Sequence, residues 1–504
     1  MQTIWIDVED LFDYAVVNPR PSGIQRVEFE ICRCLVKSVG EGPVRFLRHA
    51  PGGATFRAVP WSSVETLFAG LTGPAEEDAG APASGTLAPS IPESIVPPAP
   101  FPGSPVPRRR LRRRVLSWFA GRFPQSVRHP LGNAVLLQIS AVQNVLHAGR
   151  IALEAMAPSR PRPLPLLAAP EEARDGARPG DAPRTEPDGS DDFGEARPGD
   201  ILLVLGSPWF HRRYAALVAG AKRERGIRFG VLLYDIIPLR RPEFCDHTLV
   251  ELFKGWLGST LPHADVVMAI SQASADDIAD YSRRNGWKLL APPVAIPMGT
   301  GFGHPAPAAR LAGREYPEAG SYALIVSTIE ARKNHLLLFR VWRRMLEEMP
   351  HDRVPTLVFA GRVGWMVQDL MQQLKNADYL DGKLVLFQDP TDGELTTLYQ
   401  GAQFTLFPSF YEGWGLPVTE SLSFGKPCII SNTTSLPEAG GALARYFDPE
   451  NASEAYRVVR EVVEDPEGLR NWQARVAREF RPVAWDEAAA AVLRTIGQAA
   501  EAPA

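Results

Sequence analysis

Two glutamates lie on either side of a glycine-rich loop in FPSFYEGWGLPVTESLSFGKPCIIS, residues 407–431. An apolar run ends near Phe407, Glu412 follows in the loop, and Pro417 suits the first residue of a helix that carries Glu420. Free N–H groups at such a helix N-terminus favour a phosphate. Glu412 is placed to accept hydrogen bonds from sugar hydroxyls, and Glu420 to hold a ribose diol. A capping loop with a solvated glutamate is the alternative, because glycine loops are common.

Two further side chains follow apolar runs in the first half of the chain. Asp235 comes at the end of one run, where it would bind or orient an acceptor hydroxyl, or cap the following turn. Trp209, in GSPWF, follows another run and would stack on a sugar ring or pack in the core. Residue type alone does not decide between the two interpretations of Asp235 or between those of Trp209.

Apolar runs suited to buried parallel strands alternate with helical patterns such as 335–348 and 394–400. The runs form two series divided by a Pro/Gly-rich junction at 291–320: first 3–6, 201–205, 229–234 and 264–270, then 322–327, 356–360, 384–387, 404–407 and 428–431. This order predicts an α/β fold with two Rossmann-like domains facing a central cleft. We expect ligands outside the carboxyl ends of the strands.

The composition is that of a soluble enzyme. Hydrophobic residues make up 45% and charged residues 22% of 504 residues, and the net charge is −4, which argues against nucleic acid as a partner. The four cysteines match no zinc pattern, and we expect buried thiols. The acidic start MQTIWIDVED is unlike a signal peptide, and no run is long enough to span a bilayer. We therefore expect a cytoplasmic protein.

Three stretches interrupt the first series. Residues 74–107 and 158–198 are rich in proline and small residues, which predicts flexible insertions. Between them, 108–123 reads RRRLRRRVLSWFAGRF, where arginines followed by aromatics suit an anionic membrane surface or a solvated linker. Contact through 106–123 would place the protein on the inner face of the plasma membrane. Residues 131–157 read as an amphipathic helix.

The second half of the chain resembles the retaining family 4 glycosyltransferases of the GT-B fold, also described as glycosyl transferases group 1. Within that family, the chain is similar to the bacterial polysaccharide mannosyltransferases. The matching segments are VSTIEARKNH (326–335), LVFAGRVGW (357–365), the E-x7-E motif EGWGLPVTE within 406–451, and Trp485 in PVAWDEAAA. In the first half, RPSGIQRVEFEICRCL (20–35), YDIIPL (234–239) and AISQASADDI (269–278) are similar to family segments. Tyr234 stands where members often have histidine.

The resemblance implies three domains and roles for particular residues. They are an acceptor-binding domain at 1–300 with the two insertions, a nucleotide-sugar-binding domain at 301–484, and a helix at 485–504 that returns to the first domain. Gly23 lies just before the first helix, at the cleft end of the first strand. The residues implied for the donor are Lys333, with Arg332 either assisting or facing solvent, Thr328, Glu412, Glu420 and the backbone of Gly413, Trp414, Gly415 and Leu416.

The cation cluster departs from the family pattern at one position. Many members have arginine where this chain has Ser327, so phosphate neutralisation would depend on Lys333, the helix N-terminus and Thr328. Glu412, Lys333 and Asp235 are the candidate catalytic residues.

The resemblance implies retaining transfer of a hexose, with mannose as the candidate, from GDP- or UDP-sugar to a cell-surface, capsular or O-antigen glycan. A lipid-linked acceptor is one form of that expectation. No cofactor and no metal are expected, since no D-x-D sits in a glycine-flanked loop after a strand and 389–392 reads as a turn.

Three alternatives remain. A nicotinamide enzyme is disfavoured because prolines follow Gly299, Gly301 and Gly303 where a helix would be needed. A nucleotide-sugar epimerase would share the architecture and act on the donor alone. A catalytically inactive glycosyltransferase-like scaffold would keep the fold without the reaction.

Overall fold

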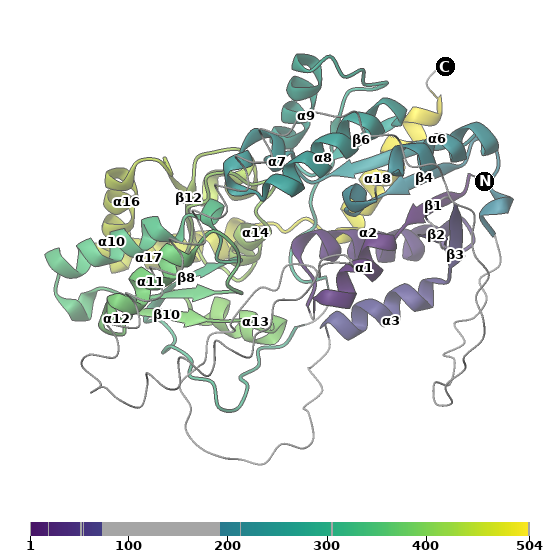
Figure 1. Ribbon diagram of the computed structural model, residues 1–504. Coiled ribbons are helices and arrows are strands. Elements are labelled where there is room, and N and C mark those ends of the chain that lie inside the picture. The colour runs from purple at the N-terminus through teal and green to yellow at the C-terminus, as the bar shows by residue number, and fades with distance from the viewer. Residues whose placement is uncertain are drawn as a thin grey trace, which may run out of the picture. The chain divides into compact units, whose positions relative to one another are not determined.

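The computed structural model describes residues 2–72 and 192–501, except 19, 51, 52, 54, 212, 304 and 305. These described residues belong to one compact unit that carries two separate sheets (Figure 1). The expected insertion at 74–107, the arginine-rich segment 106–123 and the expected helix 131–157 lie outside the described residues.

The first sheet has the strand order β3-β2-β1-β4-β5-β6-β7. Its strands pair in parallel except β3, which is antiparallel to β2. The strands are β1 (Ile4–Asp7), β2 (Val44–His49), β3 (Phe56–Val59), β4 (Ile201–Val204), β5 (Arg228–Leu233), β6 (Val266–Ala269) and β7 (Val294–Ala295). Every residue of β1, β4 and β6 is buried, which explains why these strands read as continuous apolar runs.

Helices connect these strands, and several begin at side-chain caps. The hydroxyl of Ser22 accepts from the Ile24 N–H, and Ser271 and Asp246 cap two later helices. The helices are α1 (Glu9–Val17), α2 (Gly23–Val39), α3 (Trp61–Thr72), α6 (Tyr214–Arg225), α7 (Ile237–Arg240), α8 (His247–Thr260) and α9 (Gln272–Arg284).

The second sheet is wholly parallel, with the order β10-β9-β8-β11-β12-β13. Its strands are β8 (Tyr322–Val326), β9 (Thr356–Ala360), β10 (Leu384–Phe387), β11 (Phe404–Phe407), β12 (Cys428–Ser431) and β13 (Arg445–Phe447). Its helices are α10 (His335–Glu348), α11 (Gln368–Asn376), α12 (Asp378–Asp381), α13 (Asp392–Gly401), α14 (Leu416–Ser423), α15 (Leu436–Gly440), α16 (Ala452–Glu464) and α17 (Pro466–Glu479). In each sheet the chain adds strands on one side of the first strand and then returns to add the rest on its other side. Doubly wound Rossmann sheets have this strand order. The predicted architecture of two Rossmann-like halves is confirmed.

The last helix, α18 (Trp485–Glu501), packs against α2 of the first half (Figure 1). Trp485 and Val492 are buried in the same core as Ile4 and Ile6 of β1. A Cβ on Gly299 would lie 2.3 Å from the Trp485 ring, so glycine lets the linker pass this indole closely. Where the chain divides into domains stays a prediction.

Two features differ from the sequence expectations. Strands β2, β3, β7 and β13 were not predicted, because β2 and β3 contain arginines and β7 and β13 have only two and three residues. The second expected insertion does not extend to residue 198, since Phe193 is buried and contacts Trp5 edge-on at 5.4 Å. Phe193 also contacts Phe56 of β3, and Ala196 is buried, so this segment packs against the first sheet.

All four cysteines are free, and three of them are buried, as expected. Among the described helices, none combines the length and the apolar character that crossing a membrane requires.

Candidate functional site

The centre of the candidate site is an ion cluster built by two loops of the second half. Glu412, in the loop after β11, accepts from Lys333 Nζ at 2.6 Å and from Arg332 Nη1 at 2.9 Å. Arg332 also donates to Glu330 at 2.6 Å. The loops are joined by their backbones as well, since Phe410 N–H donates to the Arg332 carbonyl at 3.0 Å. Arg332 therefore belongs to the cluster and does not face solvent.

The cluster fixes the charges of its members. Burial alone would raise the pKa of Glu412, but Arg332 and Lys333 lower it to about 2. Burial opposes the charge of Arg332 as well, and the carboxylates of Glu412 and Glu330 more than offset this, so its pKa is raised. Glu412 is therefore an acceptor of hydrogen bonds at any physiological pH, and the two cations are held at its side.

The loop around Glu412 is held by hydroxyl groups. The Glu412 N–H donates to Thr434 Oγ1 at 3.0 Å, and Ser435 Oγ donates to the carbonyls of Glu412 and Trp414 at 2.9 and 3.0 Å. Both hydroxyl residues come from the turn before α15. The backbone at this loop is therefore fixed from the side opposite the cations' loop.

Helix α14 begins immediately after this loop. Gly415 stands at its N-cap with φ 107°, a conformation that favours glycine, and Pro417 lies in the first turn. Leu416 Cδ1 would lie 3.6 Å from a Cβ on Gly23, the first residue of α2. Free backbone N–H groups and the positive end of the helix dipole thus follow directly after the loop that carries Glu412, close to the start of α2.

Glu420 is buried one turn into α14. Tyr399 OH donates to its Oε2 at 2.9 Å. Burial raises the pKa of Glu420, while Arg26 and the Tyr399 hydrogen bond act in the opposite direction. The solvated glutamate of the alternative reading is therefore excluded, because this carboxyl group is enclosed.

The loop before α14 touches the first half of the chain. A Cβ on Gly413 would lie 2.4 Å from the Tyr234 carbonyl oxygen and 3.1 Å from Asp235 Oδ2. Ser274 of α9 donates its hydroxyl to the carbonyls of Tyr234 and Gly413 at 3.0 and 3.3 Å. The carboxyl ends of β5 and β6 and the Glu412 loop thus meet.

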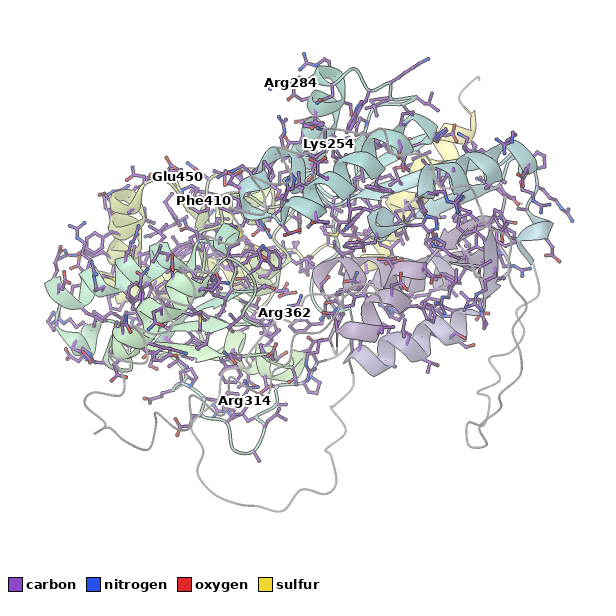
Figure 2. The ribbon with its side chains drawn as sticks, in the orientation of Figure 1. Lys254, Arg284, Arg314, Arg362, Phe410 and Glu450 are labelled. Carbon is purple, nitrogen blue, oxygen red and sulfur yellow. The ribbon has the colours of Figure 1, made fainter. Side chains whose placement is uncertain are left out.

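A second contact between the halves lies beside Glu412's loop. Phe410, labelled in Figure 2, stacks on Phe244 with ring centres 5.4 Å apart, and Arg241 lies over the Phe244 ring at 4.8 Å. Trp365 Nε1 donates to the Phe244 carbonyl at 2.9 Å. Aromatic side chains from both halves therefore meet beside the loop that carries Glu412.

The acceptor-side candidates have different outcomes. Asp235 accepts from the Ile237 N–H at 2.9 Å, so it caps the turn, yet its second oxygen lies beside Gly413. Burial raises the pKa of Asp235, against the influence of that hydrogen bond and of Arg332. Trp209 packs edge-on against Phe253 and Trp256 at 5.4 and 5.7 Å, which supports the core-packing reading.

Thr328 is placed apart from the cations. A Cβ on Gly364 would lie 2.7 Å from the Thr328 methyl carbon, so this threonine packs against the loop after β9. Its neighbour Ser327 lies 3.3 Å from His335 Nε2 at the start of α10. The cation pair of this site is Arg332 with Lys333.

Sequence reasoning missed several residues that shape the site. Arg26 forms an ion pair with Asp392 at 3.1 Å, and Glu438 accepts from the N–H groups of Gln272 and Ala273 at 2.8 Å each. These contacts join residues far apart in the chain. The sequence gives no local signal for Arg26, because α2 buries Gln25, Glu28 and Glu30 as well.

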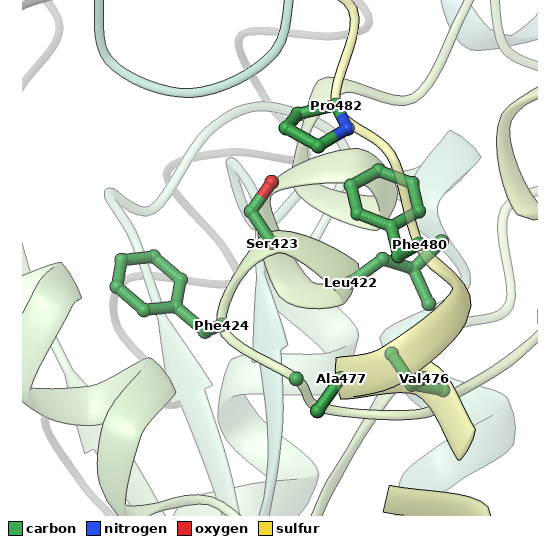
Figure 3. A pocket seen from close by; sticks show the side chains of 8 residues that line it. Leu422, Ser423, Phe424, Val476, Ala477, Phe480 and Pro482 are labelled. Carbon is green, nitrogen blue, oxygen red and sulfur yellow. The ribbon is translucent and has the colours of Figure 1, made fainter. Parts of the chain in front are cut away.

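A cavity in the second half lies apart from this site. This cavity, of about 280 Å³, lies between the end of α14, with Ser423 and Phe424, and the end of α17, with Phe480 (Figure 3). Its lining carries no charged side chain, which does not suit a sugar diphosphate. Within residues 2–72 and 192–501, no three His, Cys, Asp or Glu side chains are grouped to hold a metal ion. The expectation that no metal takes part stays a prediction.

Residues 314–479 match the model of the family described as "Glycosyl transferases group 1". The chain is 26% identical over 239 residues to the serotype-specific mannosyltransferase WbdA of Escherichia coli, covering 46% of this chain and 29% of WbdA. It is 26% identical over 253 residues to O-antigen chain mannosyltransferase B of E. coli, covering 50% of this chain and 66% of that protein. The solved structure of Anabaena Alr3699/HepE in complex with UDP and glucose has a TM-score of 0.45 and 16% identity, covering 59% of this chain and 78% of that one. This chain thus spans less than a third of WbdA and about two thirds of the second relative. The chain is therefore similar to the glycosyl transferases group 1 family over residues 314–479 and, over about half of its length, to bacterial mannosyltransferases.

Proposed function

We propose that this protein is a retaining glycosyltransferase that moves a hexose, mannose in the first instance, from a nucleoside diphosphate sugar to a growing cell-surface glycan. The observation that carries the proposal is Glu412, held between Arg332 and Lys333 in front of the N-terminus of α14. An anion-binding helix end, two cations and a buried carboxylate are the groups that a sugar diphosphate needs. The two E. coli relatives are named as mannosyltransferases, one of them for the O-antigen chain.

In the proposed complex, the diphosphate lies against Lys333, Arg332 and the first N–H groups of α14. Glu420 takes the ribose diol, and Glu412 takes hydroxyl groups of the sugar. The backbone at Gly413, Trp414, Gly415 and Leu416 approaches the sugar and the phosphates. The diphosphate and Glu412 then share the two cations, so donor binding keeps both cations in place.

The proposed transfer occurs on one face of the sugar. The bond between the anomeric carbon and the β-phosphate oxygen breaks, and an acceptor oxygen forms its bond to the same carbon from the same side. The acceptor proton passes to the departing phosphate oxygen, on which negative charge grows. Lys333, Arg332 and the dipole of α14 stabilise that charge, and no metal and no protein nucleophile are used.

We place the acceptor hydroxyl beside Asp235 and the N-terminus of α2 at Gly23. Asp235 lies at the carboxyl end of β5, against the Glu412 loop. Its free oxygen is positioned to accept a hydrogen bond from a hydroxyl group and so to orient it. In this role Asp235 would contribute to transfer by positioning the acceptor.

The proposal extends to a lipid-linked acceptor at the inner face of the plasma membrane through residues 106–123. This part rests on the sequence RRRLRRRVLSWF alone. Deleting 106–123 should lower recovery of the protein with anionic vesicles in a sedimentation experiment. Equal sedimentation of the deleted and full chains would remove the membrane from the proposal.

Calorimetric titration with GDP, UDP and ADP tests the donor site. We expect one nucleotide to bind, and Lys333→Ala to weaken it by about tenfold to a hundredfold. Lys254→Ala is the control, because Lys254 is exposed on α8 (Figure 2). Consumption of the sugar nucleotide only when a glycan acceptor is present would separate a transferase from an epimerase. Failure of all three nucleotides to bind the wild-type protein would favour a scaffold without catalysis.

A further inference from the structure

Arg26 is a buried cation at the contact between α2 and the second half of the chain. Its Nη1 donates to the Phe302 carbonyl at 2.8 Å, and its Nη2 donates to both oxygens of Asp392 at 3.1 Å. Its guanidinium also lies over the Phe302 ring, 5.2 Å from the centre. One side chain thus joins α2, the linker between the sheets and the first residue of α13.

A series of ring contacts leads from Arg26 to Glu420. Phe302 lies 6.5 Å from Phe424, which stacks on Tyr399 with ring centres 5.2 Å apart. Tyr399 in turn donates its hydroxyl to Glu420 at 2.9 Å. The position of Arg26 and the position of Glu420 are therefore set by one packed group of side chains.

The same groups set the charge of Glu420. Burial raises the pKa of this carboxyl group, Arg26 and the Tyr399 hydroxyl lower it, and Asp392 raises it. Of the elements around α14, α2 contributes Arg26, α13 contributes Tyr399 and Asp392, and β12 contributes Cys428, whose thiol is kept neutral by burial. A buried carboxylate with one neutral donor depends on a nearby cation to stay ionised, and Arg26 is the cation that acts on Glu420.

We propose that Arg26 is a positioning residue for the nucleotide: held by Asp392 and Phe302, it places a positive charge beside the packed side chains that hold Glu420, so that the contact of α2 with α13 and the binding of the ribose are coupled. This inference rests on the proposed function, in which Glu420 takes the ribose diol. It adds that a residue of the first half controls a group of the donor site in the second half.

Arg33 provides a matched control on the same helix. It lies two turns further along α2 and also reaches the linker, since its Nη2 donates to the Gly303 carbonyl at 3.0 Å. Its carboxylate partner is Glu30, and it is absent from the charges that act on Glu420. Arg33→Gln therefore removes a contact of α2 with the linker and leaves the electrostatics of Glu420 unchanged.

The first experiment measures the protonation of Glu420 itself. In protein labelled with ¹³C at the glutamate carboxyl carbons, the Glu420 signal is assigned by its loss in Glu420→Gln and followed against pH. Arg26→Gln should move the titration midpoint to higher pH, and Arg26→Lys should restore much of it. Asp392→Asn should move the midpoint to lower pH, although it breaks the same ion pair. If Arg26 had a purely structural role, Arg26→Gln and Asp392→Asn would shift the titration midpoint of Glu420 in the same direction. That result, or an unchanged midpoint in both variants, overturns the inference.

The second experiment follows nucleotide affinity, with whichever of GDP, UDP and ADP binds the wild-type protein. Arg26→Gln should weaken binding about 5- to 150-fold at neutral pH, and the affinity should fall at a higher pH than in the wild type when the solution is acidified. Arg33→Gln should bind as the wild type does. If the wild-type protein binds none of the three nucleotides, the proposed function fails, while the titration of Glu420 still decides the role of Arg26. If the wild type binds and Arg26→Gln binds equally well at every pH, the coupling is wrong.

Discussion

Gly413 lies so close to Tyr234 that no other residue fits: a Cβ at position 413 would be 2.4 Å from the Tyr234 carbonyl oxygen. The contact is between backbones, one at the end of β5 and one in the loop that carries Glu412. Because neither side has a flexible atom to move, the loop and the first half of the chain must separate to admit a methyl group. The glycine therefore sets how closely Glu412 approaches Asp235.

Gly413→Ala should lower sugar transfer by at least about 100-fold, since a displacement near 1 Å at a reacting centre costs that much. Thermal unfolding should change little by comparison. Gly255→Ala is the control, because a Cβ on Gly255 in α8 meets no atom within 4 Å. Transfer rates of the two variants, measured with a labelled sugar nucleotide, decide the matter; equal rates would show that the close approach is not needed.

Glu412→Gln should separate binding from transfer. The change removes the negative charge that Lys333 and Arg332 now share, so both cations become more available to a diphosphate. We expect nucleotide affinity to stay equal or increase, while transfer falls about 10²- to 10³-fold through loss of the contact with the sugar. Calorimetry and a transfer assay on the same preparation test this. Loss of nucleotide affinity would contradict the placement of the diphosphate against the cations.

The free energy of unfolding should depend on the ionisation of Glu412 at acidic pH. Its pKa is lowered from its ordinary value of 4.5 to about 2, so the folded state favours the ionised form. This contribution is present above the unfolded pKa and is lost as the pH falls from about 4.5 to about 2, and it amounts to ~3 kcal/mol. Urea unfolding of the wild type and Glu412→Gln across this range should show a difference that shrinks as the pH falls. A difference independent of pH would contradict the ion cluster.

Glu438→Gln should loosen the contact between the two halves at α9. The Glu438 carboxylate accepts two backbone N–H groups at the N-terminus of α9, and the amide can accept through one oxygen only. We expect a loss of about 0.5–2 kcal/mol in the free energy of unfolding and faster amide exchange at Gln272 and Ala273. Glu65→Gln, at an exposed carboxylate in the middle of α3, should change neither quantity. Unchanged exchange in Glu438→Gln would show that the contact is not formed in solution.

Most of the second half could be predicted from the sequence because its strands are buried on both faces. The predicted bounds of β9 to β12 and of α10 agree with the structure. Strand β2 was missed because Arg45 and Arg48 interrupt it, and Arg48 is tolerated through a paired contact with Glu9 at 3.0 Å. Such a partner cannot be read from the local pattern.

The site residues that lie in one loop and the helix after it could be predicted from the sequence. The contacts between loops that are distant in the chain could not. The spacing of Glu412 and Glu420 is a local signal, and their placement before and within α14 was expected. Arg332 was ambiguous because its partner Glu412 comes from another loop. Arg26 and Glu438 were missed for the same reason, since each acts across the contact between the halves.

The last helix has a consequence for how the chain folds as it is made. Trp485 and Val492 of α18 are buried beside Ile4 and Ile6 of β1, in the core of the first sheet. The second sheet lies between these segments in the chain and can complete its own core from Tyr322 onwards. During synthesis, domains generally fold as units as soon as their residues have emerged. The first sheet, although translated first, would therefore be the last to complete its core, and until then the apolar residues that pack on α18 would stay exposed to water.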